Sequence, residues 1–244
     1  MNIKSIKVQL GVFLLLFSAY ITFLEKDAGF LLTIGISVMS AVLVDSVASY
    51  LRKKEFVLTE SSIITGLIIG YVLSNSQAWW ITALASVVAI SSKHLIRFKS
   101  RHVFNPAGFG VLMAVFLLGA STEWQGAYLC YIIIPFGIYF SFKIRKLELV
   151  AGYFTASLIL FGSQALIQRV NILDVFGYLN YFFIFIMLIE PMTTPVYRAG
   201  KIMFGLGLGA LIFILYLFGI KEAELLALLF FNLSTPLLNK VRGK

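Results

Sequence analysis

The stretch LIEPMTTPVYRAGK, residues 188–201, decides how this chain can fold. It places one acidic residue (Glu190), two prolines and two threonines among aromatic and aliphatic residues. Proline lacks a backbone donor and disfavours helix at the residue before it, so a helix arriving from Tyr181 should break near Glu190. At membrane depth, irregular backbone persists only where protein or water satisfies its polar groups. The stretch therefore predicts a broken helix beside a cavity.

The composition around this stretch is that of a membrane protein. The 244 residues are 60% hydrophobic and 13% charged, with a mean hydropathy of +0.94. A helix that spans a membrane needs about 20 apolar residues, and ten apolar segments account for nearly the whole chain. We therefore predict an all-α polytopic membrane protein with a single membrane domain, residues 1–244. The expected segments are 8–24, 29–50, 58–74, 77–96, 104–120, 125–142, 147–167, 174–189, 201–219 and 222–239.

The net charge of +9 follows the predicted topology. All but three of the 20 Lys and Arg residues fall on one side of the ten segments, and the exceptions are Lys26, Arg169 and Lys221. Basic residues collect on the cytoplasmic side of membrane proteins. The pattern predicts a multi-pass protein of the cell membrane with cytoplasmic N- and C-termini. Its basic charge thus indicates contact with the lipid bilayer and not with nucleic acid.

The two halves of the chain carry similar polar elements. Asn105 follows Glu60 by 45 residues, and Asn232 follows Glu190 by 42 residues. With five segments in each half, the second half would be inverted relative to the first. Inverted repeats with broken helices that meet near the midplane are typical of membrane transport folds. We therefore expect repeat 1 over about 1–122 and repeat 2 over about 123–244, with broken or half helices.

Two helix starts are expected in the first half. Thr59 or Ser61 is placed to cap a helix, and Asn105 is placed to cap another helix that has Pro106 at its first position. A helix start below the membrane surface would turn its free N–H groups and its positive dipole end toward a polar ligand.

Three acidic residues are candidates for ion coupling, because ionisable groups inside spans tend to be functional. These are Asp45, Glu60 and Glu190. Two of them have a simpler alternative. Asp45 lies close enough to a basic stop to sit at the membrane interface, and Glu190 could pair at the surface with Arg198 or Lys201.

Helix packing offers a simpler interpretation of other residues as well. Pro191 and Pro195 could kink a helix, with Thr193 and Thr194 bonding the freed carbonyls. The small residues near Gly66, and the glycines that follow Lys201, favour close helix contact.

Four pieces of the sequence, read in order, resemble one known family. They are SIITGLIIG (62–70), KH at 93–94 with FNPA (104–107), EPMTTP (190–195) with GKIMFG (200–205), and FN at 231–232 with PLLN (236–239). The family comprises homologous membrane subunits of the ion-translocating NADH:quinone reductase and of the Rnf electron-transport complex. The resemblance implies two inverted five-helix repeats similar to urea transporters. It also implies a flavin cofactor and redox partner proteins or flavoproteins.

The sequence departs from that family where a covalent flavin would be attached. Family members that carry one use a threonine in a Ser-Gly-Ala-Thr motif within a long external loop. The corresponding loop here reads GASTEW (119–124) and is short. We therefore expect no covalent flavin, and any flavin (riboflavin or FMN) would be bound non-covalently.

The resemblance, with the polar residues above, predicts a subunit of a flavin-linked electron-transport system. Such a subunit would hold a non-covalent flavin or relay electrons across the membrane, with or without coupling to ion movement. If it takes part in an enzyme, it would be one subunit of a membrane oxidoreductase that is not active alone. The alternative is an inverted-repeat transporter or channel for a small solute such as a flavin or urea. No catalytic residue and no metal ligand set is expected. The candidate cofactor-binding residues are Thr65, Asn105, Pro106, Glu190, Thr193, Thr194 and Asn232.

Overall fold

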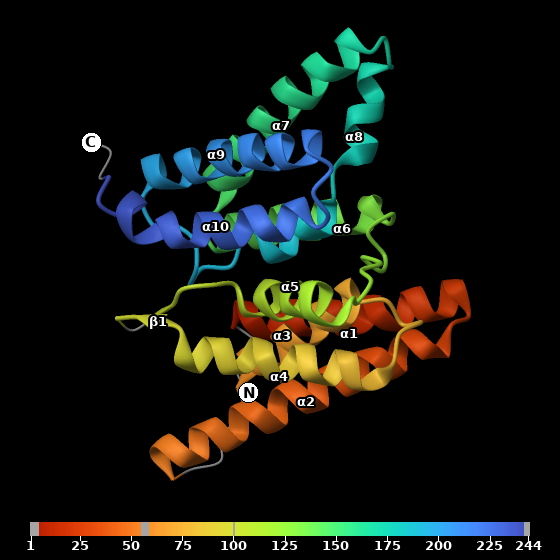
Figure 1. The fold of residues 1–244 in the computed structure, drawn as a ribbon, viewed down its shortest axis with the longest axis vertical. Coiled ribbons are helices and arrows are strands. Elements are labelled where there is room, and N and C mark those ends of the chain that lie inside the picture. Colours follow the sequence, from red (N-terminus) through yellow and green to blue (C-terminus); the bar gives the residue numbers. More distant parts are fainter. Residues whose placement is uncertain (1–4, 55–58, 100, 242–244) are drawn as a thin grey trace. The chain divides into compact units, whose positions relative to one another are not determined.

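The computed structural model describes residues 5–54, 59–99 and 101–241, apart from the side chains of Lys53 and Ile172. The chain forms two compact units, residues 1–128 and 129–244 (Figure 1). Both predicted cytoplasmic termini lie outside the described residues. The sequence predicted a single domain with a repeat boundary near residue 122, and this stays a prediction.

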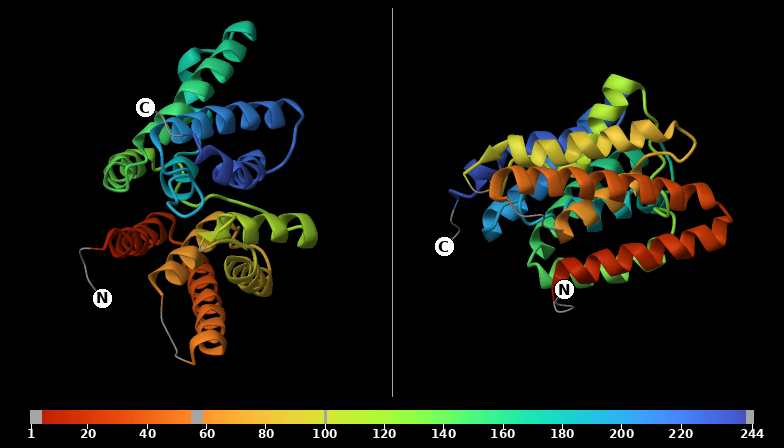
Figure 2. Two further views of the ribbon diagram at one scale, coloured as in Figure 1. Left: turned by 90° about the vertical axis from the view of Figure 1, so that its left-hand side faces the viewer. Right: turned by 90° about the horizontal axis from the view of Figure 1, so that it is seen from below.

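The first unit is built from helices and one short hairpin. A two-residue connection joins the first two helices, which run as a hairpin in Figure 2. The small antiparallel hairpin between the fourth and fifth helices pairs Arg97 with His102. The elements are α1 (Ile6–Glu25), α2 (Ala28–Lys53), α3 (Glu60–Val72), α4 (Trp79–Leu95), β1 (Arg97–Phe98), β2 (Arg101–His102) and α5 (Pro106–Leu118).

The core of this unit surrounds Tyr71, near the end of α3. Its ring stacks on Phe17 and meets the edge of Phe30, and its hydroxyl donates to the carbonyl of Leu14 at 2.6 Å. A buried tyrosine of this kind combines a large apolar contact with a satisfied polar group. Helices α1, α2 and α3 are thereby fixed to one another.

Glycines allow α3 to approach α2 closely, as the sequence predicted. A Cβ atom added to Gly66 would lie 2.6 Å from the Cα of Val38, a distance that real side chains do not adopt. At membrane depth, small residues let helix backbones pack in direct contact. The position of α3, and of the polar residues at its start, depends on this contact.

The second unit contains four longer helices and a broken segment. The helices are α6 (Cys130–Lys143), α7 (Leu147–Ile167), α9 (Arg198–Leu217) and α10 (Ala223–Leu238). The segment between α7 and α9 contains η1 (Ile172–Asp174), α8 (Val175–Tyr178) and a π-helical turn η2 (Phe183–Met187). Helices α7 and α9 pack closely at Gly205. A Cβ atom added to Gly205 would lie only 2.2 Å from the carbonyl oxygen of Leu149, so only glycine fits there.

The all-α polytopic class predicted from the sequence is confirmed. Among the described residues, the helices that are long and apolar enough to cross a membrane are 6–25, 28–52, 147–167 and 198–217. Shorter apolar helices cover 60–72, 106–118, 130–143 and 223–238. A helix of 13 residues, such as α3, extends only about 20 Å and is too short to cross a hydrocarbon core of about 30 Å. The count of ten spans and their inverted arrangement stay predictions.

The similar spacing of Glu60 and Asn105 in one half, and of Glu190 and Asn232 in the other, suggested equivalent positions. The local structure at these residues differs between the two halves. Glu60 lies in the first turn of α3, whereas Glu190 follows the end of a helical segment. Asn105 caps the start of α5, whereas Asn232 lies inside α10. The spacing of these residues therefore does not define structurally matched positions.

Candidate functional site

The chain leaves helical structure at Glu190, as the prolines predicted. The π-helical turn η2 is closed by a bond from the amide of Leu188 to the carbonyl of Phe183 (2.9 Å), and residues 188–197 follow as turns and irregular backbone. Single π-helical turns commonly mark functional sites. We refer to residues 190–197 as the proline loop.

Two threonines of the proline loop donate hydrogen bonds to Glu190, the first residue of the loop. The hydroxyl of Thr194 donates to the carbonyl of Glu190 at 2.6 Å, and that of Thr193 donates to the Glu190 carboxylate at 3.3 Å. Thr194 and Thr193 are buried, with exposed fractions of 0% and 1%. The hydroxyl of Thr194 therefore serves the irregular backbone, in the simpler role considered above, whereas that of Thr193 binds a side chain.

Helix α10 closes the loop from another side. The side-chain amide of Asn232 (3.2 Å) and the hydroxyl of Thr235 (2.7 Å) both donate to the carbonyl of Thr193. At the far end of the helix, the side chain of Asn239 accepts from the amide of Val196 at 2.8 Å. The cofactor-binding candidates Glu190, Thr193, Thr194 and Asn232 are thus brought together in one cluster.

A buried lysine completes this cluster. The ammonium group of Lys146, which precedes α7, donates to the carbonyls of Pro195 (2.7 Å) and Thr194 (3.3 Å). Lys146 is only 4% exposed. The sequence predicted Lys146 as an ordinary basic residue of a cytoplasmic turn, and only its position opposite the loop reveals the contact.

Lys201, which the sequence offered with Arg198 as a partner of Glu190, forms an ion pair with another acidic residue. Lys201 lies in the first turn of α9, and its ammonium group contacts the carboxylate of Glu148 on α7 at 3.2 Å. This contact joins α7 and α9 near the point where Gly205 meets Leu149. Glu148 was absent from the sequence-based candidates, because nothing local distinguishes it.

In the first unit, the predicted helix starts are confirmed. The side chain of Thr59 caps α3 by accepting from the amide of Ser62. The side chain of Asn105 caps α5 by accepting from the amide of Gly108 at 2.9 Å, and Pro106 occupies the first helical position. These starts satisfy amide groups that a helix leaves open.

Thr65 and Glu60 also make bonds within the protein. The hydroxyl of Thr65 donates to the carbonyl of Ser61 one turn earlier (2.8 Å). The carboxylate of Glu60 accepts from the hydroxyl of Ser5, at the start of α1, at 3.1 Å. Glu60 lies in the first turn of α3, where the helix dipole favours a negative charge.

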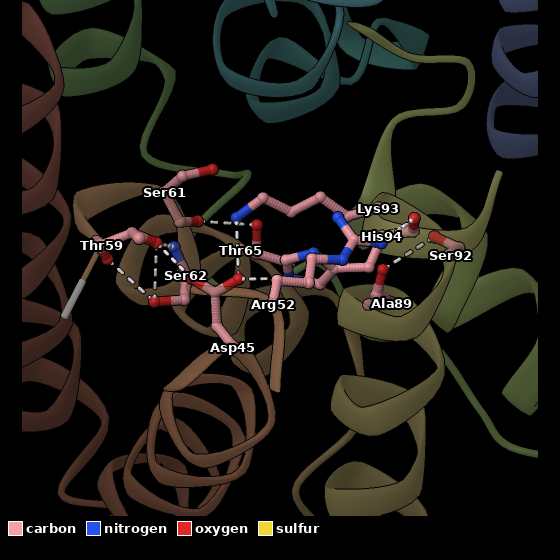
Figure 3. A network of polar contacts seen from close by, with 10 residues as sticks. All are labelled: Asp45, Arg52, Thr59, Ser61, Ser62, Thr65, Ala89, Ser92, Lys93 and His94. Carbon is pink, nitrogen blue, oxygen red and sulfur yellow. Dashed lines mark hydrogen bonds and ion pairs between the residues drawn. The ribbon is translucent and has the colours of Figure 1, made fainter. Parts of the chain in front are cut away.

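Asp45 lies at the centre of a polar network (Figure 3). This α2 residue is buried, with an exposed fraction of 1%, and its place at the membrane interface stays a prediction. One carboxylate oxygen contacts His94 Nε2 at 2.7 Å and Lys93 Nζ at 3.3 Å, both from the last turn of α4. The other accepts from the hydroxyl of Thr59. Asp45 therefore joins α2 to the end of α4 and to the start of α3.

The structure places the other site candidates in different hydrogen-bonding environments. Thr65 and Asn105 bond within their own helices, Glu60 binds Ser5, and Asp45 binds His94 from another helix. Among the described residues, no three His, Cys, Asp or Glu side chains gather in a way that could hold a metal ion.

The sequence of the whole chain matches one protein family. The sequence model of the NQR2, RnfD, RnfE family matches residues 2–128 and 126–244. The chain belongs to this family. The resemblance based on the four sequence pieces is thereby confirmed, and both compact units lie almost entirely within the matched regions.

One similar protein belongs to an ion-translocating oxidoreductase complex of Yersinia enterocolitica, as one of its subunits. The two sequences are 35% identical over 103 residues, which represent 39% of this chain and 29% of that protein. The matched region therefore covers less than a third of the relative's length.

Proposed function

We propose that this member of the family is a membrane subunit of an ion-translocating oxidoreductase complex that relays electrons across the membrane. Membership of the NQR2, RnfD, RnfE family carries this proposal, and the name of the Yersinia relative supports it. In such a complex the chain would depend on redox partner proteins or flavoproteins. Among the three ion-coupling candidates, Asp45 is the most deeply buried.

A flavin is the cofactor that the resemblance implies, and it would supply the redox chemistry. In the described structure, the candidate flavin contacts are engaged with the protein itself. Thr194 bonds Glu190, Asn232 bonds Thr193, and Asn105 bonds the start of its own helix. A flavin bound there would have to use the remaining donor and acceptor capacity of these side chains or replace these internal bonds. We therefore favour relay between flavin-bearing partners over a flavin held by the proline loop, and we assign no step to a bound flavin.

The bound-flavin version is tested by a visible absorption spectrum. The purified chain, after incubation with FMN or riboflavin and removal of the excess, is expected to show no flavin band near about 450 nm. A band that remains with the protein, and that weakens in Asn232→Ala, would show instead that the chain holds its own flavin.

The relay itself is tested in membrane vesicles from the native cells. Vesicles with the chain are expected to move ions when an electron donor is added, and vesicles lacking it are not. Equal donor-driven ion movement in both would contradict the proposal.

A transporter for a small solute is the second candidate. Its supporting observation is the broken segment before α9, because irregular backbone between helices is common at transporter binding sites. Proteoliposomes that contain only this chain should then take up riboflavin or urea without an electron donor. Absence of uptake under these conditions would exclude this candidate for both solutes.

A further inference from the structure

We propose that His94 and Asp45 form a proton-binding site, in which His94 exchanges a proton with water and Asp45 balances the charge. The site requires neither a flavin nor a partner, so it holds for the isolated protein whichever proposed function is correct. The simplest alternative is a static ion pair that only joins two helices.

Both oxygens of the Asp45 carboxylate are held by donors. An ionised carboxylate only accepts hydrogen bonds. The nitrogen of His94 that faces it at 2.7 Å therefore carries a proton, and so does the Thr59 hydroxyl on the other side. The carboxylate of Asp45 is thus fixed in place by groups from α4 and from the start of α3.

The two cations differ in what they can do. A lysine ammonium is a constant charge, whereas imidazole is the side chain that ordinarily changes its charge near neutral pH. The side chain of His94 is 16% exposed, whereas that of Asp45 is 2% exposed. His94 therefore lies between a buried carboxylate and the surface of the unit.

Other charged groups surround the pair. Lys93 Nζ lies 3.3 Å from the Asp45 carboxylate, and Arg52 from α2 donates to the backbone carbonyl of His94 at 2.7 Å. Glu60 at the start of α3 binds Ser5. Proton uptake places one hydrogen on the second ring nitrogen of His94, while the bond from the first nitrogen to Asp45 stays in place. That bond gains strength, because both of its partners are then charged.

The proton is also coupled to the start of α3. The hydroxyl of Thr59 donates to Asp45 and at the same time accepts from the amide of Ser62, which caps the helix. A change in the charge of His94 therefore alters the strength of the hydrogen bond between Thr59 and Asp45, and with it the cap of α3. The last turn of α4 favours a cation as well, because the negative end of the helix dipole lies there.

The test uses the fact that the chain has only two histidines. The full-length His102→Gln variant, labelled with isotopic histidine and placed in lipid nanodiscs, leaves only the ring signals of His94 in a nuclear magnetic resonance spectrum. We expect these signals to change reversibly, as for one proton, between pH of about 5 and about 9. A ring whose signals stay constant over this range would overturn the proposal.

Two substitutions in the His102→Gln background separate proton exchange from a static contact. Asp45→Asn should move the midpoint of the pH-dependent change in the His94 ring signals to lower pH, because the attracting charge is lost. Lys93→Gln should move it to higher pH, because a repelling charge is lost. The control Glu60→Gln removes an acid that binds Ser5 and should leave the midpoint in place.

If Asp45→Asn does not fold, Lys93→Gln decides the question. A midpoint that rises in Lys93→Gln supports the site, and an unchanged midpoint overturns it. A midpoint that stays in place in a folded Asp45→Asn protein also overturns it, since the carboxylate would then have no influence on the proton.

Discussion

At the scale of single residues, the proline loop shows how polar side chains replace the missing bonds of a broken helix. Proline at 191 and 195 cannot donate, so the nearby carbonyls need other donors. Thr194, Asn232 and Lys146 supply them from three different parts of the chain. These bonds allow irregular backbone to lie among buried side chains.

Replacing Thr194 by valine tests this account at one bond. Thr194→Val keeps the shape of the side chain and removes the donor to the Glu190 carbonyl, so we expect a loss of about 1–3 kcal/mol in the free energy of unfolding. The matched control is Thr155→Val in α7, whose hydroxyl donates one turn back to Ala151 but is exposed. Denaturant unfolding of the purified protein compares the two. Equal losses in both variants would show that burial of the bond is unimportant.

At the scale of elements, glycines decide which helices come into contact. Gly66 lies against α2 and Gly205 lies against α7, and in each case a Cβ atom would meet backbone. Backbone atoms cannot turn aside as a flexible side chain can. The sequence predicted close helix contact at these glycines, but it did not identify the partner helix in either case, because the facing residues are distant in the sequence.

A pair of alanine substitutions tests this packing within the first unit. Gly66→Ala should force α3 away from Val38 and lower the free energy of unfolding by about 1–3 kcal/mol. Gly35→Ala on α2 serves as the control, because no atom lies within 4 Å of the added Cβ. This control should be neutral or should stabilise the protein by up to about 1 kcal/mol, since alanine is the better helix former. The prediction fails if both variants unfold alike in a thermal or denaturant titration.

At the scale of the whole molecule, the sequence made its most general predictions from apolar runs and charge. Helices occur close to nine of the ten expected segments, and the segment expected over 174–189 is instead divided into α8 and η2. The division falls at Leu179 and Asn180, and the part that follows contains a buried π-helical turn, a geometry without a simple sequence signal. The cytoplasmic placement of the termini rests on the basic residues alone.

Reporter fusions test the predicted topology. A fluorescent protein that matures only in the cytoplasm should fluoresce when it is joined after Lys244, and alkaline phosphatase joined there should be inactive. Fusion after Lys221, on the expected outer side, should give active phosphatase. Active phosphatase after Lys244 would place the C-terminus outside and would reverse the predicted orientation.

The sequence by itself determined the membrane class, the helix starts at Thr59 and Asn105, the break near Glu190 and the family. These features depend on apolar runs, caps and prolines, whose effects reach only a few residues along the chain. Only the tertiary structure decided the partners of the buried polar groups. His94 is 49 residues from Asp45, and Pro195 is 49 residues from Lys146. Such contacts are set by the packing of whole helices, which no local pattern specifies.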